Sequence, residues 1–110
     1  MTTFDLYGTA QPDIDEVARQ VAAALRIGLQ PRHSYYLGGY YKGEPEGDVS
    51  LRVQPNLNAP DEEEEDDRYQ VPAFKHLPVL LYLTVERDAE RYEGLLAGLA
   101  GLRLLRRAVR

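Results

Sequence analysis

The chain has 110 residues, 44% of them hydrophobic, and a net charge of −5, which predicts a single domain over residues 1–110 and excludes wholesale disorder. It has no cysteine, which excludes a disulfide framework and a thiolate nucleophile. The N-terminus lacks a signal-peptide pattern and no apolar run reaches the ~20 residues that cross a bilayer, so we expect a cytoplasmic protein without membrane contact.

The first predicted elements are a strand and a helix. Residues 3–7 alternate between apolar and polar side chains, which predicts a half-buried strand that ends at Gly8. Apolar residues then recur at helical spacing, which predicts a helix from Asp13, as its N-cap, to about Ile27. Gly28 stands where a C′ glycine would close this helix.

The middle of the chain predicts strands separated by loops. Tyrosines on both sides of Gly38-Gly39 predict two short strands around a tight turn or a bulge, and residues 49–54 alternate as a strand with one solvent-exposed face. Residues 55–77 form a long predicted loop, and loops of that length are more often functional or disordered than merely connective. Residues 78–85 form the longest apolar run and predict a central strand covered on both faces.

Residues 88–101 predict a second amphipathic helix, and residues 102–109 predict the last strand. The order β-α-β-β-β-β-α-β predicts an α+β two-layer sandwich, in which two helices cover one face of a mostly antiparallel sheet of about five to six strands. The other face would be partly open. Its outward-facing candidates are Tyr7, Tyr35 or Tyr36, Arg52 and Arg107.

The sequence offers little for catalysis. The two histidines, His33 and His76, lie in a strand and a loop with no orienting partner in the pattern. His33 and Ser34 cannot act together because neighbouring strand residues point to opposite faces. A hydrolase or transferase would need an acid/base pair assembled from scattered residues. We therefore expect no enzyme activity, no cofactor and no metal site.

One segment concentrates the negative charge. Its seven consecutive carboxylates are Asp61, Glu62, Glu63, Glu64, Glu65, Asp66 and Asp67. The rest of the chain is net positive by two. The run lacks the glycine and ligand spacing of a Ca²⁺ loop. One interpretation is a solvated loop that aids solubility; the other is a surface that attracts a basic partner. The acidic total argues against general nucleic-acid binding.

The eight tyrosines outnumber the two phenylalanines, and there is no tryptophan. Adjacent tyrosines on a strand should face opposite sides of the sheet. An outward tyrosine is commonly just a good strand former, but several on one open face beside an acidic loop would suit a recognition surface. The tyrosines that we assign to partner binding are Tyr35, Tyr36, Tyr40, Tyr41 and Tyr69.

The chain resembles the small immunity proteins encoded beside bacterial polymorphic or contact-dependent toxins. The resemblance rests on RHSYYLGGYY at residues 32–41, VQPN at 53–56, the acidic proline-bounded loop, and PVLLY at 78–82. It implies a cytoplasmic protein that binds a cognate toxin domain, often a nuclease with a basic cleft, and inhibits it without catalysis. It implies no fixed set of binding residues. We expect a monomer or a weak homodimer.

A second hypothesis comes from another class. The open face of the sheet could instead form a pocket in a small-molecule-binding regulatory α+β domain. This hypothesis predicts an apolar, tyrosine-lined concavity and thermal stabilisation by a metabolite.

Overall fold

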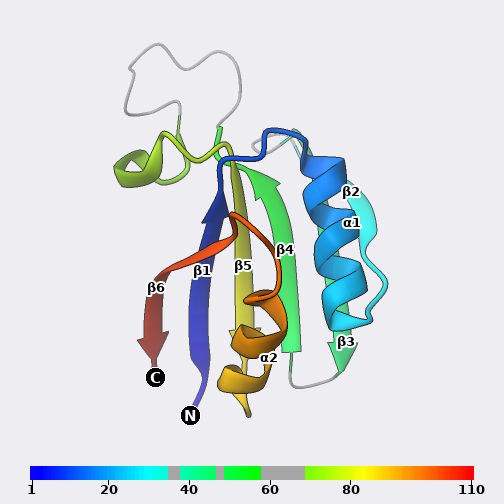
Figure 1. Cartoon of the computed structure of the whole chain (residues 1–110), viewed down its shortest axis with the longest axis vertical. Coiled ribbons are helices and arrows are strands. Elements are labelled where there is room, and N and C mark those ends of the chain that lie inside the picture. Colours follow the sequence, from blue (N-terminus) through cyan, green and yellow to red (C-terminus); the bar gives the residue numbers. More distant parts are fainter. Residues whose placement is uncertain (35–37, 47–48, 58–68) are drawn as a thin grey trace.

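The computed structural model describes residues 1–34, 38–46, 49–57 and 69–110 (Figure 1). In chain order the elements are β1 (Thr3–Thr9), α1 (Ile14–Leu25), β2 (Gln30–Ser34), β3 (Gly38–Glu46), β4 (Val49–Pro55), the 3₁₀ turn η2 (Pro72–Phe74), β5 (Val79–Val85), α2 (Ala89–Leu96) and β6 (Arg103–Val109). The predicted α+β class and order of elements are confirmed.

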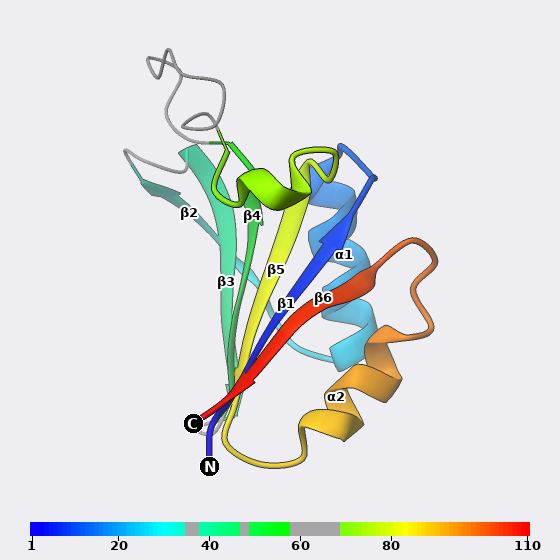
Figure 2. The same ribbon diagram turned by 90° about the vertical axis from the view of Figure 1, so that its left-hand side faces the viewer.

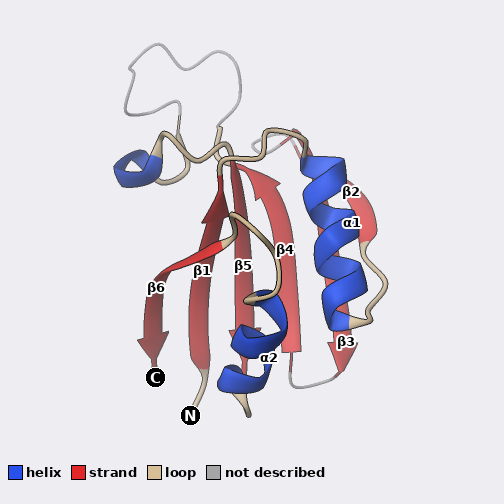
Figure 3. Cartoon of the chain, in the orientation of Figure 1, coloured by secondary structure: helices blue, strands red, loops and turns tan. Residues whose placement is uncertain are grey.

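The strands form one six-stranded antiparallel sheet with the order β2-β3-β4-β5-β1-β6 (Figure 3). Both helices lie on the same side of it, which we call the helix side (Figure 2). Without β2 and β3, the remaining elements form a β-α-β-β-α-β unit, in which the strand order is β4-β5-β1-β6. The hairpin of β2 and β3 extends this unit at one edge. We call the face opposite the helices the open face.

Strand β5 is central, as predicted, and is buried from both sides. Its residues Val79, Leu81, Leu83 and Val85 point to the helix side, where they join the main core. The other buried members of that core are Tyr7, Val17, Val21, Leu25, Val49, Leu51, Val53, Ala89, Tyr92 and Leu96. The alternate residue Leu80 lies in a second, smaller core on the open face. A non-alternating apolar strand is the expected result of two covered faces.

Helix α1 begins as the sequence predicts but ends earlier. The Asp13 side chain accepts hydrogen bonds from the backbone N–H groups of Asp15 and Glu16, at 3.0 and 3.2 Å. The predicted closure at Gly28 is wrong, because Arg26 itself adopts the left-handed conformation with φ of 57° and ends the helix. Such a conformation is uncommon for a residue with a side chain, so composition pointed to the nearby glycine instead.

Helix α2 is also shorter than predicted and ends at Leu96, before Gly98 and Gly101. Asp88 occupies the N-cap position, but its φ is 62° and its side chain makes no capping hydrogen bond. The helix is instead held from its middle. Its Glu93 accepts a bond from Arg107 Nη2 at 2.7 Å, which connects α2 to the edge strand β6.

Arg107 also forms a bidentate ion pair on the helix side. Its Nε and Nη2 atoms donate to the two carboxylate oxygens of Asp5, both at 2.8 Å, and the Asp5 side chain is fully buried. The Asp5 bond raises the pKa of Arg107 further above its usual range. A buried carboxylate requires such a partner, because an isolated charge away from water is costly. The pair therefore fixes β6 beside β1.

A single buried amide holds the segment 71–77 against the end of the sheet. The Oδ1 atom of Asn56 accepts from the Val71 backbone N–H at 2.8 Å, and Nδ2 donates to the carbonyls of Phe74 and Leu77 at 3.0 and 3.1 Å. Asn56 is fully buried. The segment thereby covers the open face at this end, where Val71 and Phe74 complete the smaller core. The remaining members of that core are Leu6, Leu80, Tyr82 and Leu105.

We predict that Asn56→Leu lowers the free energy of unfolding by about 3 kcal/mol, because it leaves the Val71 N–H and the facing carbonyls buried without partners. The matched control is Gln54→Met on the same strand. Gln54 is equally buried, but neither polar atom of its amide has a hydrogen-bond partner among the described residues. This control should keep or raise stability in urea denaturation. Equal losses from both substitutions would contradict the role of Asn56.

Tyr7 provides a pH-dependent prediction. Burial, followed by the charges of Asp5 and Glu93, raises the pKa of Tyr7 to about 12. The unfolded chain loses this proton near pH 10, so the folded state loses stability as the pH rises from about 10 to 12. Tyr7→Phe removes this loss, and its stability relative to the parent should rise by about 1 kcal/mol between pH 9 and 11. Urea midpoints at both pH values measure it; parallel curves would contradict it.

Candidate functional site

The structure describes only some of the residues that the sequence analysis assigned to partner binding. The acidic run 61–67, Tyr35 and Tyr36 lie outside the described residues. Tyr69 is half-buried and lies two residues before Val71, where the segment 71–77 begins. The assignments of the run and of this tyrosine pair therefore stay predictions.

Tyr40 and Tyr41 face opposite sides of the sheet, as their adjacency predicts. Tyr41 lies opposite Val53 on the helix side, and its hydroxyl donates to Asp15 Oδ1 on α1 at 2.5 Å. That bond raises the pKa of Tyr41. Tyr40 lies on the open face, opposite Arg32 of β2. Of this pair, Tyr40 is the one that lies on the open face, and the assignment of both to partner binding stays a prediction.

Two of the residues predicted for the open face lie on the helix side instead. Tyr7 is 3% exposed within the main core, and Arg107 pairs with Asp5 and Glu93. The prediction failed because both faces of β1 carry apolar residues, and the segment 71–77 buries Leu6 on the face that was expected to be open. Arg52 lies on the open face, as predicted.

The open face carries a row of side chains that crosses every strand. Cross-strand partners in the ladder point to the same side of a sheet, about 5 Å apart. The partners in register, from β2 to β6, are Gln30, Lys42, Arg52, Tyr82, Leu6 and Arg106. We call this set the open-face row. It places three cations and a central tyrosine along one line.

Arginines on this face are stacked on aromatic rings. The guanidinium carbon of Arg52 lies 5.2 Å from the centre of the Tyr82 ring. Arg106 lies 5.2 Å from the Phe74 ring. Arg110 lies 5.6 Å from the Phe4 ring. Stacking restrains the planar guanidinium and leaves its N–H edges available for hydrogen bonding.

The central tyrosine of the row has a perturbed acidity. Burial raises the pKa of Tyr82, whereas the positive charges of Arg52 and Arg106 act in the opposite direction because they favour the phenolate. Tyr82 is half-buried at the boundary between the smaller core and the exposed part of the open face.

Charge is divided between the two layers of the described structure. Glu44 and Glu46 belong to β3, and the other described acidic residues belong to α1, α2 and the turns leading into them, except for Asp5, which points to the helix side. The acidic residues outside β3 are Asp5, Asp13, Asp15, Glu16, Glu86, Asp88, Glu90 and Glu93. The open face presents cations from four strands, namely Arg32 of β2, Lys42 of β3, Arg52 of β4 and Arg106 of β6. Such a face attracts negative charge.

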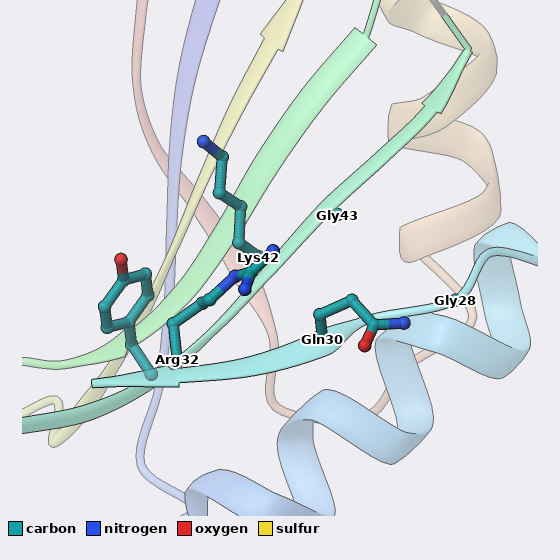
Figure 4. Close-up of a pocket in the computed structure, with 6 residues that line it drawn as sticks. Gly28, Gln30, Arg32, Lys42 and Gly43 are labelled. Carbon is teal, nitrogen blue, oxygen red and sulfur yellow. The ribbon is translucent and has the colours of Figure 1, made fainter.

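The edge hairpin adds a hollow to this face. Its volume is about 500 Å³, and it is lined by Gly28, Gln30, Arg32, Tyr40, Lys42 and Gly43 (Figure 4). Arg32 and Lys42 project from neighbouring strands on the same side of the sheet. The lining is polar and cationic, which differs from the apolar concavity expected of a small-molecule pocket.

The described residues form no obvious reaction centre. His33 and His76 are both exposed, on β2 and just after η2. In the described part of the chain, no group of histidine and carboxylate side chains is arranged to hold a metal ion. No described helix is long and apolar enough to cross a membrane.

Comparison with known proteins does not assign the chain. No protein-family model matches it, and no curated protein matches it.

Sequence reasoning missed several residues of the open face. Lys42 could have been found, because it lies two residues after Tyr40 on the same strand and so shares its face. Arg106 could not, because a register shift between β1 and β6 at Leu6 and Tyr7 breaks the simple alternation of β6. No sequence pattern could have placed Phe74 on the open face, because loop residues follow no hydrophobic periodicity.

We predict that Arg52→Met raises the pKa of Tyr82 further. Methionine still covers the ring, but it removes the positive charge that favours the phenolate. Ring-carbon NMR titration of Tyr82 measures the change. The matched control is Arg91→Met, which removes an arginine stacked on Tyr92 in α2 and should leave the Tyr82 titration unchanged. An unchanged titration in Arg52→Met would mean that this stacking does not persist in solution.

Proposed function

We propose that the protein is a cytoplasmic immunity protein, which neutralises a cognate bacterial toxin domain by stoichiometric binding and without catalysis. The class comes from the resemblance described above. The observation that carries the proposal is the open face, where one rigid sheet presents Tyr40, Tyr82 and arginines together. Tyrosine and arginine are the residues most enriched in the energetic centres of protein interfaces.

The location of this face supports a protein partner. It is an extended surface on regular strands, so its side chains are held without ordering a loop on binding. The segment 71–77, fixed by Asn56, forms one border, and the hollow of the edge hairpin lies at the β2–β3 edge. A toxin domain could place a projection in this hollow while covering Tyr40.

The acidic run 61–67 has a separate role in the proposal. Its seven carboxylates would attract the basic surface of a nuclease-type toxin and accelerate the encounter. Asn56 and Val71 are described residues on the two sides of the run, and the hydrogen bond between them lies at the border of the open face. The run and the open face would therefore contact one partner.

The hollow supports a second candidate, a regulatory domain that binds a small molecule. Because Arg32 and Lys42 line it, the ligand would be anionic. A metabolite that raises the melting temperature, and loses this effect in Arg32→Gln, would favour this function over toxin binding.

The deciding test is co-expression with the C-terminal domain of the protein encoded immediately upstream in the source genome. We expect that this domain arrests bacterial growth, that the chain restores growth, and that the two proteins co-purify at equal stoichiometry. Toxicity that the chain does not relieve, or an absence of toxicity, would reject the immunity function for that neighbour.

Variants of the chain then locate the contact in the purified complex. Neutralising residues 61–67 should slow association and reduce its salt dependence. Tyr40→Ala should accelerate dissociation, with a loss of about 2 kcal/mol in binding free energy if its ring is a hot spot. Arg91→Gln on α2 is the control and should change neither rate. Unaffected kinetics in both test variants would place the interface elsewhere.

A further inference from the structure

We propose that the open face recognises carboxylates, and that its occupant is an acidic patch on the surface of a partner protein. This inference rests on the proposed function and adds the chemistry of the partner. The acidic run was expected to meet a basic surface. The open face requires the opposite charge, so the partner would present an acidic patch next to a basic one.

The arginines of the open face are already restrained by aromatic rings. The rings of Tyr82, Phe74 and Phe4 lie beneath Arg52, Arg106 and Arg110 respectively. Each guanidinium is thus restrained in its plane before any ligand arrives. A guanidinium group that is already restrained loses less side-chain entropy when it donates two parallel hydrogen bonds to a carboxylate.

The positive charges of the open face are widely spaced. Lys42 and Arg52 are neighbours in the open-face row, whereas β5 and β1 separate Arg52 from Arg106. Strands lie about 5 Å apart, so the attachment points of Arg52 and Arg106 are separated by about 14 Å. This span is wider than one small anion can bridge. It suits several carboxylates spread over the surface of a folded partner.

The aromatic rings of the open face favour a protein partner over a nucleic acid. Single-stranded nucleic acids are bound by a basic groove together with exposed ring faces on which bases stack. On the open face, Tyr82 and Phe74 are half-buried, and each ring already has one of the chain's own arginines over it.

The test uses the full chain and two labelled probes of equal charge, an oligoglutamate peptide and a single-stranded oligothymidylate. We expect the chain to bind oligoglutamate in preference to oligothymidylate at low ionic strength. Binding of the peptide should weaken by about tenfold in the double variant Arg52→Gln/Arg106→Gln. The matched control is Arg91→Gln, which removes one stacked arginine from the helix layer and should stay within about twofold of the parent.

Four results would overturn the inference. They are tighter binding of oligothymidylate, no binding of the peptide, an equal loss in Arg91→Gln, and self-association of the parent chain that the double variant abolishes. The last result would make a second copy of the chain the occupant. Circular dichroism and thermal unfolding verify that each variant folds. The double variant Arg52→Lys/Arg106→Lys keeps the positive charge but removes the bidentate guanidinium group. Its affinity for the peptide should therefore lie between those of the parent and the glutamine variant.

This test is independent of the growth assay. Failure of the chain to relieve toxicity, with peptide binding as expected, would reject the immunity function and leave the carboxylate-binding face intact. Restored growth without peptide binding would support the immunity function and reject the open face as a site that binds an acidic patch of the partner.

Discussion

The arrangement of the open face depends on the buried amide of Asn56. By bonding to Val71, Phe74 and Leu77, it holds a loop segment across one end of the sheet. This segment buries Leu6 and Leu80 and supplies the ring beneath Arg106. One side chain thus determines where the apolar part of the face ends and where the cationic part begins. An aliphatic residue of the same size would fill the space but could not pair the loop's backbone groups.

The two faces of the sheet use arginine differently. On the helix side, Arg107 is paired with Asp5 and Glu93, so its charge is neutralised within the fold. On the open face, Arg52 and Arg106 stack on the rings of Tyr82 and Phe74. The difference follows from position. A buried carboxylate demands a compensating partner, whereas a side chain at the surface keeps its solvation while an aromatic ring restrains it.

Much of the fold could be predicted because its periodicity is clear. The central strand at 78–85, both amphipathic helices and the order of elements were all evident from the spacing of apolar residues. The opposite orientation of Tyr40 and Tyr41 followed from strand alternation alone. Helix ends were less certain, since Arg26 adopts a left-handed conformation that local preference assigns to glycine.

The sequence by itself determined the class of fold, the single acidic run and which residues could alternate on each strand. Only the tertiary structure decided which face of β1 is open, because both of its faces carry apolar residues and a loop distant in sequence covers one of them. It also decided which cations gather, because the open-face row joins residues from six strands in a register that a bulge shifts at β6. Alternation is a local property that the sequence records. Register and coverage arise from contacts between distant segments, so only the folded chain reveals them.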